Sequence, residues 1–337
     1  MSAATDVSLV LATYNGAAHV ARTIAAIRGL RREALLFELL VLDDGSTDDT
    51  RAVVRASVHG AAFPVRFVDL PVNGGKAHAL NCGIACATGA LLAFLDDDIE
   101  PDAEWLVAHA AVHATAVVPV ACVGPVRYPA EWVRRSNLVR YRAGQCAATT
   151  GSVADAPHVA GIECFAGGNL SIRKEVLLQA GGFNEALRRA EDRELAIRLH
   201  QRGVPLWFAP QAGVIHYEQE MLSYAGLAAK YQAYYRGDAQ RIEGLHPKDW
   251  DLAGRWCLQP VRATDDAWAR RVVKRAVRWL GQPWLGRRLF ALLERMDGWH
   301  WLYSRRLYQY AFLCLALEAR RCNDGFSNTR LPTRAAP

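Results

Sequence analysis

Residues 90–98 have the sequence ALLAFLDDD, an apolar run that ends in three consecutive aspartates. Three earlier apolar runs, each followed by a longer segment with helical patterning, cover residues 7–12, 35–42 and 65–70. Short strands that alternate with longer helices predict an α/β fold with a single doubly wound, mainly parallel sheet flanked by helices.

Polar residues follow three of these four predicted strands. Thr13–Gly16 follows the first, Asp43–Asp48 the second and Asp96–Asp98 the fourth. With right-handed crossovers, the loops after the strands of an open α/β sheet lie along one edge, where ligands bind. We therefore expect the three clusters to converge on one ligand site.

The aspartates at 96–98 place three negative charges at the end of a buried strand, which is costly unless a cation or hydrogen-bond donors offset them. Oxygen ligands suit Mg²⁺ or Mn²⁺, which proteins often hold with one or two carboxylates and the phosphates of a substrate. The sequence therefore predicts a Mn²⁺ or Mg²⁺ site. The alternative is that these acids only favour a helix N-terminus.

The Asp43–Asp48 segment has two interpretations. Asp and Gly form turns, and Thr47 or Asp48 could cap the next helix. After a strand of this kind, an acidic side chain can also accept a hydrogen bond from a base or ribose. Tyr14 offers an aromatic face on which a base could stack. Neither a dinucleotide-binding glycine motif nor a P-loop is present.

Motifs between Val7 and Glu218 resemble, in order and spacing, those of the family 2 glycosyltransferases, which have the GT-A fold. They are Thr13-Tyr14-Asn15, Asp43–Asp48, Asn73–Asn81 with Gly83, Asp96–Asp98, Gly167-Gly168-Asn169 and Glu191–Leu195. The resemblance implies that Asp44 binds a uracil-type base and that Lys76 approaches the nucleotide or diphosphate. It also implies that Asp96 and Asp98 form the D-x-D pair that holds ribose and metal.

The resemblance assigns three kinds of site residue. Asp98 and His216 are the predicted metal ligands, although a histidine at the end of a strand can also be purely structural. Asp192 is the predicted general base, although Glu191 and Asp192 could merely favour the positive end of a helix. The predicted donor-binding residues are Thr13, Tyr14, Asp44, Lys76, Asp96 and Asp97.

The function that follows is a metal-dependent, inverting glycosyltransferase. It would move a sugar from a nucleotide-diphosphate donor, expected to be a UDP-sugar, to a hydroxyl of a saccharide, lipid-linked or small-molecule acceptor. A carboxylate base is needed because a sugar hydroxyl is a poor nucleophile. The alternative function is a non-catalytic protein that binds sugar nucleotide or glycan. Nucleotidyl transfer is disfavoured, since no glycine-rich phosphate loop lies near the N-terminus.

The predicted division places a GT-A catalytic domain at residues 1–220 and a helical, Trp-rich region at 221–337. Lys and Arg total 20 against 24 acidic residues in the first part, and 20 against 10 in the second. Within the second part, residues 270–280 alternate basic and apolar residues at helical spacing. This pattern is compatible with a helix at a membrane surface, a packed lid or a homo-oligomer contact.

Further expectations concern connections and location. We expect a strand at 117–126, an Arg-rich connection at 127–142 and a small-residue loop to 161 near the acceptor. Order resumes with a strand at 167–172 and a helix at 191–201. With no secretory signal and no apolar stretch long enough to span a bilayer, the expected location is the cytoplasm, or peripherally the inner face of the membrane. No nucleic-acid partner is expected.

Overall fold

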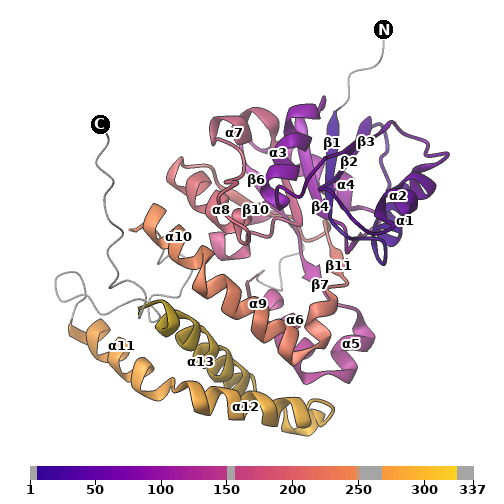
Figure 1. The fold of residues 1–337 in the computed structure, drawn as a ribbon. Coiled ribbons are helices and arrows are strands. Elements are labelled where there is room, and N and C mark those ends of the chain that lie inside the picture. Colours follow the sequence, from indigo (N-terminus) through magenta and orange to yellow (C-terminus); the bar gives the residue numbers. More distant parts are fainter. Residues whose placement is uncertain (1–5, 150–155, 248, 250–267, 325–337) are drawn as a thin grey trace, which may run out of the picture. The chain divides into compact units, whose positions relative to one another are not determined.

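The computed structural model describes residues 6–149, 156–247, 249 and 268–324. The chain forms two compact units (Figure 1). Unit 1 comprises residues 1–134 and 142–218, and unit 2 comprises residues 135–141 and 219–337.

The main sheet of unit 1 has eight strands. In spatial order they are β3 (Val65–Asp69), β2 (Phe37–Asp43), β1 (Val7–Thr13), β4 (Leu91–Asp96), β9 (Asn169–Arg173), β6 (Ala121–Val123), β10 (Leu206–Phe208) and β8 (His158–Ala160). The first four are parallel, whereas β9 runs antiparallel to both β4 and β6. This confirms the predicted mainly parallel sheet of an α/β fold.

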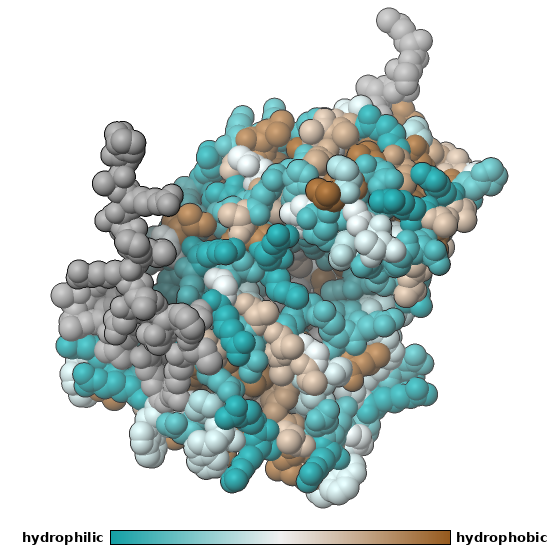
Figure 2. Space-filling view, viewed as in Figure 1, coloured by the Kyte–Doolittle hydropathy of each residue, from teal (hydrophilic) through white to brown (hydrophobic). Residues whose placement is uncertain are grey.

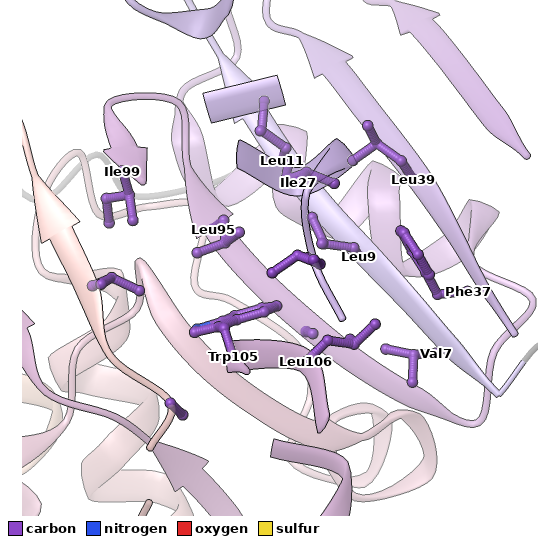
Figure 3. Close-up of a cluster of buried hydrophobic side chains, with 14 of the residues drawn as sticks. Val7, Leu9, Leu11, Ile27, Phe37, Leu39, Leu95, Ile99, Trp105 and Leu106 are labelled. Atoms are coloured by element: carbon purple, nitrogen blue, oxygen red, sulfur yellow. The ribbon is translucent and has the colours of Figure 1, made fainter. Parts of the chain in front are cut away.

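Helices cover both faces of this sheet, so its strands are apolar on both sides. On β1, Leu9 and Leu11 belong to one hydrophobic cluster and Val10 to the other. The first cluster packs against α1 (Val20–Arg28), α2 (Thr50–Val58) and α4 (Trp105–Thr115), and Figure 3 shows its centre around Trp105. The second packs against α3 (Lys76–Cys86), α7 (Lys174–Gln179) and α8 (Glu191–Gln201).

A second sheet, which the sequence did not indicate, contains three short strands. They are β5 (Ile99–Pro101), β11 (Val214–His216) and β7 (Val126–Arg127), in that spatial order. Strand β11 runs antiparallel to β5, with His216 opposite Ile99. The pairing brings His216 to the residue that follows the aspartate cluster.

The segment from 117 to 161 differs from the expectation. The strand predicted at 117–126 is divided between β6 and β7, because Pro125 lacks the N–H that a continuous ladder needs. The predicted connection and loop contain α5 (Ala130–Arg135), α6 (Asn137–Thr149) and β8. The expectation of a loop was therefore wrong for the described part, and residues 150–155 lie outside it.

A buried polar network joins α4 to β9. Trp105 Nε1 donates to Asn169 Oδ1 at 2.8 Å, and His109 Nε2 lies 3.0 Å from the same oxygen. Ser171 Oγ lies 2.8 Å from ring nitrogens of both His109 and His113. Asn169 also donates to the carbonyl of Ala212 at 3.0 Å. The network fixes β9 directly after Gly167-Gly168.

This network predicts a pH-dependent stability. Burial lowers the pKa of His109 to about 4, below its ordinary 6.5. The neutral histidine therefore contributes its full stabilisation above pH 6.5, and this is lost as pH falls towards about 4, because the unfolded chain binds the extra proton. In His109→Gln, the loss of unfolding free energy between pH 6.5 and 5 should be about 1.5 kcal/mol smaller than in the wild type.

Denaturant unfolding at the two pH values measures this difference. The loss of unfolding free energy in the wild type is not diagnostic by itself. His19 and His216 have raised pKa values, so their contribution to the pH dependence of stability has the opposite sign to that of His109. Equal pH dependence in His109→Gln and wild type would contradict a neutral, buried His109.

Unit 2 is helical, which confirms the predicted helical C-terminal region. Its helices are α9 (Tyr224–Arg236), α10 (Asp238–Leu245), α11 (Trp268–Leu280), α12 (Pro283–Arg295) and α13 (Arg305–Asp324). Short 3₁₀ turns lie at Gln219–Leu222 and His300–Leu302 here, and at Ile162–Cys164 in unit 1. Helix α13 packs against α9 and α12. Among the described residues, none of the helices has the length and apolar character needed to cross a membrane.

The core of unit 2 is aromatic. Tyr141 stacks on Tyr308 and Phe312, and the Tyr224 and Tyr308 hydroxyls lie 2.6 Å apart. The Tyr224 hydroxyl also donates to Asp297 Oδ1 at 2.6 Å. The surface of the protein, in the view of Figure 2, is largely hydrophilic, with scattered hydrophobic residues.

Candidate active site

The three polar clusters meet at one edge of the main sheet, as predicted. Thr13 pairs with Asp43 on β2, and Ala12 pairs with Asp96 on β4. The backbone N–H of Asn15 donates to Ser46 Oγ at 2.9 Å, which connects the loop after β1 to the loop after β2. The parallel register of β2, β1 and β4 is what brings these strand ends together.

Asp44 organises the segment that leads into α3. Its two carboxylate oxygens accept the backbone N–H groups of Gly74 and Gly75, both at 2.8 Å, and the residue is 3 % exposed. Because Lys76 is the first residue of α3, these hydrogen bonds fix the backbone position from which its side chain extends. Base binding by Asp44 stays a prediction.

Lys76 lies between two carboxylates from different elements. Its Nζ is 2.5 Å from Asp96 Oδ1 at the end of β4 and 3.6 Å from Glu191 Oε1 at the start of α8. Burial alone would lower the pKa of Lys76, but the two carboxylates outweigh it and raise that pKa. Burial also raises the pKa of Glu191, an effect that Lys76 opposes. The lysine is therefore a fixed positive charge beside the aspartate cluster.

Asp97 faces a different environment from its two neighbours. Its Oδ2 accepts a hydrogen bond from Thr13 Oγ1 at 2.5 Å and lies 3.3 Å from His19 Nε2. This contact with Asp97 raises the pKa of His19 against the lowering effect of burial. Sequence reasoning missed His19, for which the sequence carries no motif. Thr13 and Asp97 thus bond to each other, and their donor-binding roles stay predictions.

Asp98 and His216 lie together, as the predicted metal pair requires. His216 Nε2 is 3.2 Å from both carboxylate oxygens of Asp98. The Tyr217 N–H donates to the carbonyl of Asp98 at 2.8 Å, and Tyr128 stacks on the His216 ring. Burial raises the pKa of Asp98, but the bond to His216 outweighs it, and the net pKa is lowered.

The donor set of this pair fits a divalent ion only in part. A carboxylate and an imidazole suit Mn²⁺ or Mg²⁺ when substrate phosphates and water complete the coordination. Among the described residues, no group of three or more His, Cys, Asp or Glu side chains could hold a metal ion. The protein pair would therefore need a phosphate-bearing ligand to complete the site.

Asp192 lies at the start of α8, one residue after Glu191. Its Oδ1 accepts the Arg193 N–H at 2.6 Å, and its Oδ2 accepts the Gly167 N–H at 3.0 Å. Ala190, two residues before Asp192, has φ 58°, a left-handed conformation that is unfavourable for a residue with a Cβ. Such strain is typical of functional sites.

Gly167 and Gly168 lie between the two acidic groups. A Cβ on Gly167 would lie 2.6 Å from Asp192 Cβ, and one on Gly168 would lie 2.6 Å from Asp96 Oδ2. Any larger residue would displace the carboxylates. The absence of side chains at Gly167 and Gly168 therefore lets Asp192 and Asp96 lie directly against this backbone segment.

Tyr14 completes the set of predicted residues. Its side chain is 47 % exposed, and the adjacent Asn15 has φ 50. An exposed aromatic ring in the loop that follows β1 is suited to stacking on a planar ligand. Stacking by Tyr14 stays a prediction.

Residues 8–177, half of the chain, match the family model described as glycosyl transferase family 2. The pre-mycofactocin glycosyltransferase of Mycobacterium tuberculosis is 28% identical over 247 residues, which cover 72% of this chain and 48% of the relative. The validoxylamine A glucosyltransferase of Streptomyces hygroscopicus is 31% identical over 224 residues, which cover 59% of this chain and 52% of the relative. The chain thus spans about half the length of these curated relatives.

Solved structures agree on the fold. The mannosyltransferase PcManGT from Pyrobaculum calidifontis, in complex with GDP-Man and Mn²⁺, has a TM-score of 0.62 at 20% identity, covering 97% of this chain and 89% of that one. Residues 1–349 of S. aureus TarS, in complex with UDP, have a TM-score of 0.50 at 14% identity, covering 95% of this chain and 92% of that one. With its sheet order, its acidic strand ends and the family match, the chain belongs to glycosyl transferase family 2 and has the GT-A fold.

Proposed function

We propose that this protein is an inverting, metal-dependent glycosyltransferase that uses a nucleotide-diphosphate sugar. One observation carries the proposal: Asp96 and Asp192, which are distant in sequence, both lie against the Gly167-Gly168 backbone. A donor bound at Asp96 would therefore lie beside Asp192. A protein that only binds sugar nucleotides has no need of a carboxylate at that place.

The proposed chemistry uses the acids in different roles. Asp192 takes the proton from an acceptor hydroxyl as its oxygen bonds to the anomeric carbon. The bond from that carbon to the phosphate oxygen breaks on the opposite face, so the nucleoside diphosphate leaves and the configuration inverts. Lys76 offsets the charge of the leaving diphosphate in this proposal. A divalent ion held by Asp98 and His216 would supply further electrostatic stabilisation there.

For the donor and the acceptor, we propose the chemical class. The fold neighbours were solved with GDP-Man and with UDP, so both nucleotides are candidates, and we retain a UDP-sugar as the first choice. The named relatives act on different acceptors, in keeping with a saccharide, lipid-linked or small-molecule hydroxyl. We assign donor binding and catalysis to residues 1–220, with a cytoplasmic location and no nucleic-acid partner.

Calorimetric titration tests the donor site. UDP, GDP and dTDP are each titrated into the purified protein with Mn²⁺, with Mg²⁺ and with a chelator. We expect one nucleotide to bind preferentially, and only with metal. The preferred nucleotide then guides a screen of its sugar derivatives for release of nucleoside diphosphate. Absence of binding by all three nucleotides under every condition would contradict the proposal.

Replacing Lys76 tests the electrostatic role of this residue. Lys76→Met keeps the aliphatic stem but removes the charge between Asp96 and Glu191. Because hydrogen bonds to charged groups contribute about 1.5–3 kcal/mol, we expect nucleoside diphosphate to bind about tenfold to a hundredfold more weakly.

Lys174→Met is the matched control. Lys174 is also the first residue of a helix, but its amine donates to the carbonyl of Ala87 at 2.7 Å. Its replacement should leave nucleotide affinity within about twofold of the wild type. Equal affinities in Lys76→Met and wild type would remove Lys76 from the diphosphate site.

A further inference from the structure

Helix α11 has an unusual orientation for an amphipathic helix. It contains five Lys and Arg residues and no acidic residue. With 3.6 residues per turn, all its basic residues fall on one half of the helix and all its apolar residues on the other. A surface helix of a water-soluble domain turns its apolar half towards the core. In α11, by contrast, the apolar half is exposed.

The apolar half of α11 is exposed. Trp268 and Trp279 are 73% and 75% exposed, and Val272, Val273 and Leu280 on the same half are also exposed. On the basic half, Lys274 is only 2% exposed, whereas Arg270 and Arg275 are exposed. The helix thus presents two tryptophans and three aliphatic side chains outward; we call these five residues the α11 face.

The α11 face is held in place by the rest of unit 2. Tyr310 Oη donates to the carbonyl of Leu280 at 2.5 Å, and a Cβ on Gly281 would clash with Leu317 of α13. Figure 1 shows α12 following α11 along α13. Trp284 at the start of α12 is 54% exposed, and the Arg288 guanidinium lies 5.5 Å from its ring centroid. The end of α11 is therefore anchored, while its apolar side chains point away.

The chemistry of this surface selects one occupant. Residues 268–320 carry eleven Lys and Arg but only three acidic residues, so a second copy placed on α11 would bring like charges together. An anionic bilayer offers the opposite charge. Tryptophan favours the headgroup region, and long basic side chains reach phosphates while their stems stay in apolar surroundings. None of the described helices could span the bilayer.

We propose that the α11 face binds an anionic lipid bilayer, with the helix lying in the plane of the headgroups. Apolar side chains enter the interface, and the flanking arginines contact lipid phosphates. Binding is reversible and depends on salt, because exposed charges are screened. The inference rests on unit 2 and does not depend on the proposed glycosyl transfer.

Vesicle co-sedimentation of the full chain tests the proposal. Vesicles of phosphatidylcholine alone are compared with vesicles that also contain phosphatidylglycerol, at low and high NaCl. We expect binding to the anionic vesicles only, with a blue shift of tryptophan fluorescence, and loss of binding at high salt. Failure of the wild type to bind anionic vesicles at low salt would overturn the proposal.

Matched variants identify the surface. Trp268→Ser and Trp279→Ser should each weaken vesicle binding about tenfold, and Arg275→Gln about fivefold. Trp301→Ser is the control, because Trp301 is 79% exposed but lies in the 3₁₀ turn beyond α12. An equal loss in Trp301→Ser would show that the α11 face is not the binding surface.

Two further measurements distinguish lipid binding from misfolding of a variant and from self-association. Since the substituted tryptophans are exposed, thermal unfolding and nucleotide affinity should be unchanged in all these variants. Light scattering reports the oligomeric state. A wild-type dimer that dissociates in Trp279→Ser, without vesicle binding by the wild type, would make the α11 face a contact between copies and would refute the lipid assignment.

Discussion

Asp192→Asn is expected to lower kcat about 10²- to 10⁴-fold, because an amide does not accept the proton of the acceptor hydroxyl. The asparagine can still accept the Gly167 N–H through its side-chain oxygen, as Asp192 Oδ2 does at 3.0 Å. The local geometry should therefore persist, and nucleotide affinity should remain near the wild-type value. Steady-state transfer to the identified acceptor and calorimetric binding measure the two effects separately.

Asp69→Asn is the matched control for this variant. Asp69 ends β3 and pairs with Arg51 at 3.0 Å, so its replacement removes a carboxylate from the main sheet without changing Asp192. Its kcat should stay within about twofold of the wild type, since surface ion pairs contribute little. If Asp192→Asn turned over as fast as this control, Asp192 would not be the base.

Asp98→Asn is expected to weaken metal-dependent nucleotide binding by about a hundredfold or more. Even the loss of an outer partner of a metal ligand costs 10- to 100-fold in affinity or activity. Loss of the carboxylate that faces His216 should cost at least as much. Nucleotide titrations at several Mn²⁺ concentrations measure this effect. In the variant, the residual affinity should no longer rise with metal.

Asp97→Asn provides the comparison within the same triplet. Asp97 bonds to Thr13 and lies near His19 instead of facing His216. Its replacement should leave the metal dependence of nucleotide binding intact, whatever it does to stability. If Asp97→Asn abolished the metal dependence while Asp98→Asn retained it, the metal ligand would be Asp97 and the assigned register would be wrong.

The strands and helices around the site were largely predictable. Residues 7–12, 65–70 and 90–95 were predicted as strands and match β1, β3 and β4 within one residue, and the helix at 191–201 matches α8. Long apolar runs bounded by polar turns carry a strong local signal. The same reasoning failed at 127–149, where Leu138, Val139 and Tyr141 are buried within an Arg-rich segment. Tyr141, for example, stacks on Tyr308 and Phe312, which are distant in sequence, and local patterning does not reveal such contacts.

The candidate site was predictable as a set of residues but not as a set of contacts. Ordered motifs indicated Asp96, Asp98, Asp192 and His216. They did not indicate that Lys76 lies between Asp96 and Glu191. The sequence of a strand determines which of its side chains face each side of the sheet. Which residue each side chain contacts depends on the other elements that pack against it.

By itself, the sequence determined the α/β class, the sheet edge at which the polar clusters gather and the amphipathic pattern of α11. These follow from local periodicity, and periodicity is a property of the chain alone. Only the tertiary structure decided that His216 meets Asp98, that Asp97 turns to Thr13, and that α11 exposes its apolar half. The physical reason is that each outcome depends on elements far apart in the sequence. A helix carries its two faces in its sequence, but its packing partners decide which face meets water.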